Sequence, residues 1–248
     1  YVQIVNSAGY SFNLLGPTPA GATGNAIILV GLAFVLTLAL VWLLRKKMVM
    51  SFRLAIFGST ALSAFILTSL TADVFAQNYL PPILEVPVAY GSASVVVALI
   101  AYTIFVKNRL WLSTLILAFV GAEVGSFFAE TLSPFTALAL PIAFSLYDIY
   151  AVFRGPLKQL IGTAPNIALV GMSIKAGEFT LGLGDIVFYT MLPSLAFFWV
   201  GTFAAIATLV AIDVGVVVTL YLLSKRRLLP GLPIPMLLGV LTFAVYYF

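Results

Sequence analysis

Two aspartates, Asp148 and Asp185, stand in stretches of the chain that are otherwise apolar. A charged side chain at membrane depth costs roughly 2.5–3.5 kcal/mol on insertion scales, so each aspartate calls for a partner or a function. Asp185 follows the sequence Leu181-Gly182-Leu183-Gly184. On a helix, Gly182 and Asp185 share one face, where the missing side chain would let another backbone approach closely.

Two carboxylates held close together in a place of low dielectric cannot both ionise, so the pair titrates as a unit. Such a pair can act as acid and base to activate a water for attack on a peptide carbonyl. The residues alone leave two other interpretations open. The acids could be satisfied in a packed bundle by backbone groups or by Tyr147, Tyr150 or Tyr189. They could also form the proton relay of a transporter.

The composition restricts the class of protein and the chemistry. Of 248 residues, 62% are hydrophobic and 8% are charged, whereas soluble domains are about 25% charged. A polytopic membrane protein is therefore predicted. The sequence has no cysteine and no histidine, which excludes a disulfide, a Ser-His dyad and the usual zinc and haem ligands. We expect no metal and no organic cofactor.

Apolar windows long enough to cross a membrane predict an all-α fold with eight transmembrane helices, since a span needs about 20 helical residues. The apolar run 186–223 is nearly twice that length, and we expect it to break near Gly201-Thr202-Phe203. The predicted spans are 24–44, 54–72, 87–106, 110–128, 134–153, 184–200, 204–223 and 234–248.

The basic residues predict the orientation of these spans. All 12 lysines and arginines fall in alternate loops, and the other loops have none. The positive-inside rule places these loops in the cytoplasm and the first residues outside. The net charge of +4 follows from this topology, so no nucleic-acid partner is implied. Asp148 then lies roughly 8 Å from the inner end of its span, at ~1.5 Å per residue, and Asp185 lies at similar depth in the next helix.

The loop 154–180 is the only sizeable predicted piece outside the membrane. Residues 166–174 favour a strand, Lys175-Ala176-Gly177 a turn, and residues 178–181 a returning strand. A small β-hairpin is therefore predicted in this loop. It is either an ordinary connector or an exposed edge that an extended peptide could join as an added strand.

Three motifs resemble those of the presenilins and signal peptide peptidases, a family of intramembrane aspartyl proteases. Tyr147-Asp148 resembles the YD motif of that family, and Gly182-Leu183-Gly184-Asp185 resembles its GxGD motif. Pro230-Gly231-Leu232, followed by Pro233, resembles the Pro-Ala-Leu motif, with glycine in place of alanine. Bacterial prepilin peptidases share the GxGD motif but lack the proline motif at this position. The order of the motifs on consecutive spans favours the presenilin type.

The resemblance implies a protease that cleaves single-span transmembrane proteins or peptides in the lipid bilayer. Asp148 and Asp185 would be the catalytic pair and Tyr147 a neighbour that shapes the environment of the first acid. Gly182 and Gly184 would let a substrate backbone approach, and Pro230–Pro233 would be an extended segment at the active site. The active site would lie toward the cytoplasmic side. A proton-coupled transporter using the same acids is the alternative.

The family has nine spans, so we expect one span before Tyr1. The chain would divide into an N-terminal transmembrane half, 1–153, a cytoplasmic loop, 154–181, and a C-terminal half, 182–248. The loop between the two aspartates is shorter than the corresponding loop of presenilins, which is cut during activation. Either this member works uncut, as signal peptide peptidases do, or residues are absent from this sequence. Accessory subunits and a homo-oligomer both stay open. Glu123 and Asp213, the other acids inside spans, belong to no motif and are not expected to be catalytic.

Overall fold

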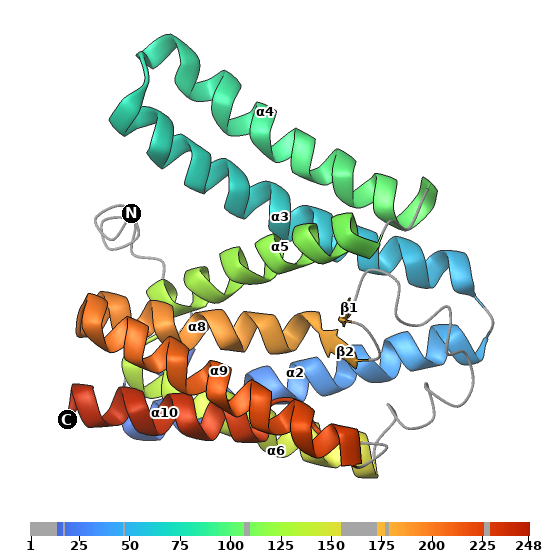
Figure 1. Ribbon diagram of the computed structural model, residues 1–248. Helices are drawn as coiled ribbons and strands as arrows, with labels where there is room; N and C mark the ends of the chain where they lie inside the picture. The colour runs from blue at the N-terminus through green and yellow to red at the C-terminus, as the bar shows by residue number, and fades with distance from the viewer. Residues whose placement is uncertain are drawn as a thin grey trace.

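The computed structural model describes residues 14–16, 18–46, 48–106, 110–154, 173–176, 179–225 and 229–248. Within these parts the chain is helical apart from one two-stranded hairpin, which confirms the predicted fold class (Figure 1). The helices are α2 (Pro19–Arg45), α3 (Val49–Tyr79), α4 (Pro82–Ala101), α5 (Leu110–Thr131), α6 (Pro134–Phe153), α8 (Leu183–Trp199), α9 (Thr202–Lys225) and α10 (Pro233–Tyr247). A π-helical turn, η1 (Tyr102–Val106), continues α4.

Proline and glycine set the ends of several helices. Pro82, Pro134 and Pro233 each occupy the first turn of a helix, where the missing N–H costs nothing because it would have no helical partner. Gly201 has a φ of +126° and separates α8 from α9. The predicted break in the long apolar run is therefore confirmed.

Six helices in the described part of the chain are long and apolar enough to cross a membrane, and α8 and α10 are apolar but shorter, at 17 and 15 residues. The chain is thus an integral, multi-pass membrane protein. Large exposed hydrophobic side chains are frequent on the outer faces of the helices, as expected where lipid rather than water surrounds the bundle.

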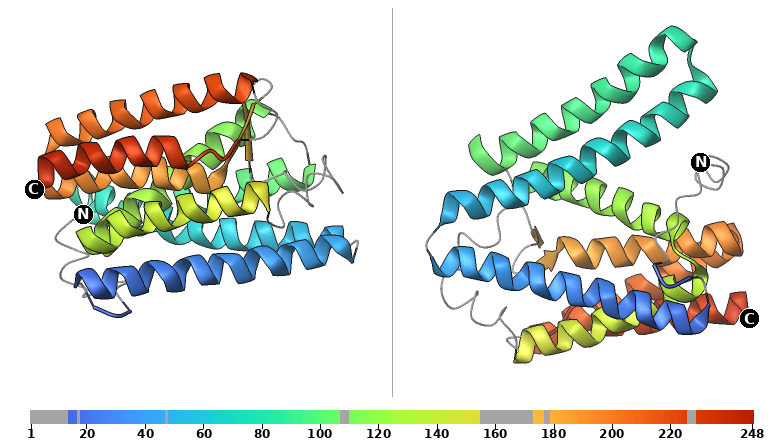
Figure 2. Two further views of the ribbon diagram at one scale, coloured as in Figure 1. Left: turned by 90° about the horizontal axis from the view of Figure 1, so that it is seen from below. Right: turned by 180° about the vertical axis from the view of Figure 1, so that it is seen from behind.

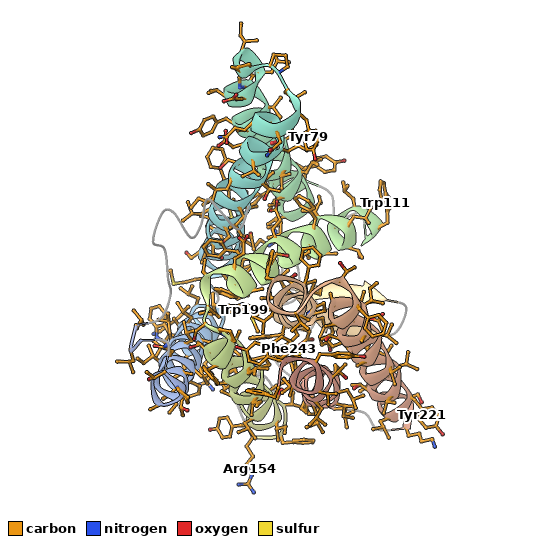
Figure 3. All side chains as sticks on the ribbon, turned by 90° about the vertical axis from the view of Figure 1, so that its left-hand side faces the viewer. Tyr79, Trp111, Arg154, Trp199, Tyr221 and Phe243 are labelled. Atoms are coloured by element: carbon orange, nitrogen blue, oxygen red, sulfur yellow. The ribbon has the colours of Figure 1, made fainter. Side chains whose placement is uncertain are left out.

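The main core lies among α6, α8, α9 and α10, which run alongside one another (Figure 2). Met191, Leu192 and Leu195 of α8 are fully buried there. Gly215 of α9 allows the backbone of α10 to approach, because a Cβ at this position would lie 2.9 Å from the Pro235 nitrogen. Phe243 of α10 points into this core, whereas Tyr221 lies at the outer side of α9 (Figure 3).

The α3–α4 pair stands apart from this core. The two helices pack along each other and diverge from the rest of the bundle toward the loop that joins them (Figure 1). A second core cluster, made of residues from α3, α4, η1 and α5, ties the pair to the bundle near the opposite end. It consists of Phe52, Ile56, Ala64, Ile100, Ile104, Ile116 and Val120.

Strands β1 (Ser173–Ala176) and β2 (Phe179–Gly182) form an antiparallel hairpin at the start of α8. The predicted hairpin is confirmed, but the predicted turn was wrong at Lys175 and Ala176. The register pairs Lys175 with Thr180 and Ala176 with Phe179, so both residues belong to the first strand. Residues 166–172, predicted as the beginning of that strand, lie outside the described residues.

Candidate active site

Asp185 is held at the point where β2 becomes α8. It is the third residue of the helix, and the N–H of Gly182, the residue that caps the helix, donates to Asp185 Oδ2 at 3.0 Å. The first N–H groups of a helix have no partner within it, so a carboxylate three residues into the helix can bond back to the capping residue. The positive end of the helix dipole also favours an anion here.

Asp148 lies on α6, five residues before the helix ends at Phe153. Its Oδ2 atom accepts a hydrogen bond of 3.1 Å from the backbone N–H of Leu232. Leu232 caps the start of α10, so its N–H is not used by a preceding helical turn. Asp148 is also close enough to Asp185 for the two carboxyl groups to interact electrostatically.

The segment Pro230–Pro233 contacts both aspartates. Gly231 lies against the Asp185 carboxyl group, because a Cβ built on Gly231 would be 3.1 Å from Asp185 Oδ2 and 3.4 Å from Cγ. The next residue, Leu232, donates to Asp148. The structure therefore brings together residues from all three motifs.

Tyr189 fixes this segment from the side of α8. It lies four residues after Asp185, on the same face of the helix, and its hydroxyl donates to the Gly231 carbonyl at 3.0 Å. The sequence suggested Tyr189 only as one of several partners for a buried acid. The spacing of four residues between Asp185 and Tyr189 indicates that both lie on one face of the helix. The contact of Tyr189 with Gly231, 42 positions away, follows only from the fold.

The other motif residues occupy different surroundings. The Tyr147 hydroxyl donates to Thr37 Oγ1 of α2 at 3.2 Å, and its ring meets Phe34 edge-on, so this side chain points toward α2. Leu183 lies beside Gly121 of α5, while Gly184 is exposed with open space where a Cβ would stand.

Glu123 and Asp213 lie away from this arrangement. Thr68 of α3 donates to Glu123 Oε2 at 2.9 Å, and Glu123 Oε1 is buried without a hydrogen-bond partner in the described structure. Asp213 is exposed near the middle of α9. Among the residues that the structure describes, no group of three or more acidic side chains could hold a metal ion.

Residues 172–248 match the family model described as Presenilin. Presenilin-B from Dictyostelium discoideum is 37% identical over 122 residues, which cover 45% of this chain and 26% of that protein. The match thus spans about a quarter of the relative. A solved presenilin family intramembrane aspartate protease shares the fold, with a TM-score of 0.67 and 20% identity over 99% of this chain and 90% of that one. The resemblance to this family is confirmed.

Proposed function

We propose that this chain is a presenilin-type intramembrane aspartyl protease that hydrolyses peptide bonds within transmembrane segments. Asp148 and Asp185 would be its catalytic residues. The observation that carries the proposal is the segment Pro230–Pro233, which contacts both aspartates through Gly231 and Leu232. An irregular backbone segment inside a membrane is tolerated beside protein or a water-filled cavity, and peptide hydrolysis requires such a cavity.

The chemistry needs one aspartate ionised and the other protonated. The ionised carboxylate takes a proton from a water as the water oxygen attacks the peptide carbonyl, and the protonated carboxyl group donates its proton to the carbonyl oxygen. Collapse of the tetrahedral intermediate moves a proton to the leaving nitrogen and breaks the C–N bond. A pair that works in a singly protonated state has a bell-shaped pH dependence.

The backbone hydrogen bonds distinguish the two oxygen atoms of each carboxyl group. The N–H of Gly182 engages Oδ2 of Asp185, and the N–H of Leu232 engages Oδ2 of Asp148. We assign the two Oδ1 atoms to the water and the substrate carbonyl. Backbone donors fix the carboxyl groups without a competing acid or base, which keeps the pair oriented before a substrate arrives.

A helical substrate must unwind locally before water can reach its carbonyl carbon. The hairpin offers a route to an extended conformation, because β2 leads directly into Gly182 and α8. A peptide that adds to the hairpin as a further strand would pass Gly184, whose backbone is exposed, on its way to Asp185. The positive-inside rule places this end of the bundle toward the cytoplasm.

The test is cleavage of a labelled transmembrane peptide by purified protein in lipid vesicles, with the products identified by mass spectrometry. The Asp148→Asn variant provides the matched control. Two fragments from the unaltered protein and none from the variant support the proposal. Intact peptide together with proton-driven solute uptake that requires the same aspartates would establish the transporter instead.

A further inference from the structure

Tyr189 connects the helix of one aspartate to the chain segment that binds the other. Its hydroxyl donates to the carbonyl oxygen of Gly231 at 3.0 Å, and its partly buried ring packs against the main core. Asp185 lies one helical turn earlier on the same face of α8. Tyr189 and Asp185 therefore contact the same short segment from the same helix.

The segment has few means of fixing its own position. Pro230 and Pro233 have no N–H, so only Gly231 and Leu232 can donate backbone hydrogen bonds within Pro230–Pro233. The Leu232 N–H donates to Asp148 Oδ2 at 3.1 Å, and the Gly231 N–H also bonds to the Asp148 carboxyl group. Tyr189 binds the carbonyl of the preceding residue, and that carbonyl belongs to the same peptide unit as the Leu232 N–H. A planar peptide unit moves as one body, so the tyrosine hydroxyl fixes the direction of the N–H bond toward Asp148.

We propose that Tyr189 is a positioning residue that holds the Gly231–Leu232 peptide unit, so that its N–H points to Asp148 while Gly231 stays against Asp185. The inference rests on the proposed function, because its readout is proteolysis. Tyr189 acts on Asp148 through this peptide unit, which its hydroxyl holds by the Gly231 carbonyl. Without its hydroxyl, the peptide unit can rotate, and the two carboxyl groups lose their fixed relation.

A merely structural tyrosine would contribute through its ring, and Tyr189→Phe keeps the ring. We expect this variant to lower kcat about tenfold, the effect of losing one neutral hydrogen bond at a reacting site, with little change in KM. A hydroxyl-containing mimic of the tetrahedral intermediate should bind weaker by a similar factor. The Tm should remain near that of the unaltered protein.

The matched control is Tyr150→Phe, because Tyr150 lies on α6 close to Asp148 in sequence but is half exposed. It should retain the full kcat. A second control is the double variant Tyr189→Phe with Gly231→Ala. Both changes act on one peptide unit, so their combined effect on kcat should be smaller than the product of the single effects.

An unchanged kcat in Tyr189→Phe would overturn the positioning role while leaving the proposed protease intact. A fall in kcat that is matched by a fall in the folded fraction, with unaltered affinity for the mimic, would also overturn it. Absence of cleavage by the unaltered protein would instead overturn the proposed function and this inference together.

Discussion

The four acids inside spans form two contrasting groups. Asp148 and Asp185 each accept a backbone N–H from a place where a helix begins. Glu123 takes its hydrogen bond from the Thr68 side chain of a neighbouring helix, and Asp213 faces outward from the middle of α9. All four interrupt apolar sequence, so depth alone does not distinguish them.

The difference follows from where a helical membrane protein has spare backbone donors. Within a helix every N–H is bonded to a carbonyl four residues earlier, so a carboxylate there must find a side chain, water or lipid. The first N–H groups of a helix are unpaired. Helices α8 and α10 begin at one place, and their free donors bind Asp185 and Asp148 there. A pair of acids that faces two helix starts is thus held by backbone donors, which an acid beside the middle of a helix does not meet.

The largest effect should come from removing one member of the pair. Asp148→Asn and Asp185→Asn should each abolish measurable cleavage while leaving the fold intact, because general acid–base catalysis contributes roughly 10²–10⁴-fold and each variant lacks one partner. Fragment yield from the labelled peptide and circular dichroism provide the two readouts. Full activity of either variant would refute the two-aspartate mechanism.

The orientation of the pair should produce a preference among substrates. By the positive-inside rule, the basic loops predict that α6 runs from outside to inside and that α8 runs from inside to outside. We therefore expect single-span substrates with their N-terminus outside to be cleaved in preference, near the cytoplasmic side. The measurement uses one span sequence inserted in both orientations in vesicles. Equal cleavage, or preference for the opposite orientation, would contradict the directional prediction.

A smaller effect should come from filling the space between Gly231 and Asp185. In Gly231→Ala the new methyl group would stand 3.1 Å from Asp185 Oδ2, so the carboxyl group or the segment must shift by a few tenths of an ångström. We expect kcat/KM to fall about fivefold, or about 1 kcal/mol in the barrier. Unchanged kinetics would mean that the site has room for this methyl group.

The smallest effect should come from the other group of acids. Asp213→Asn removes the charge of an outward-facing side chain that contributes nothing to the pair, so cleavage should stay within about twofold of the unaltered protein, as for most surface changes. Initial rates under the conditions of the first experiment measure this. A loss comparable to that of Asp148→Asn would erase the distinction between the two groups.

Hydropathy windows predicted α6 better than α3. The predicted span 134–153 coincides with α6, which begins at Pro134 directly after Ser133, whose side chain accepts a hydrogen bond from the Thr136 N–H. Helix α3 extends beyond the predicted 54–72 to Val49 and Tyr79. A hydropathy window detects only the part of a helix that is apolar, whereas helix formation continues through the polar residues at both ends.

In the candidate site, too, some features could be predicted from local sequence and others could not. Asp148 and Asp185 could be chosen as candidates from residue type, motif and predicted depth. The donors that bind them could not, because the Leu232 N–H reaches across 84 positions and the Tyr189 hydroxyl across 42. Such contacts arise from the packing of α6, α8 and α10, and no local spacing encodes them.

The shortness of α8 has a consequence for the surrounding lipid. At ~1.5 Å per residue, a helix of 17 residues spans about 26 Å, less than the ~30 Å of a typical hydrocarbon layer. Lipid beside a short span thins to match it. Helix α8 begins two residues before Asp185, so thinning at this end would bring the headgroup region and its water toward that carboxyl group. We therefore expect the activity of this site to depend on the hydrophobic thickness of the membrane.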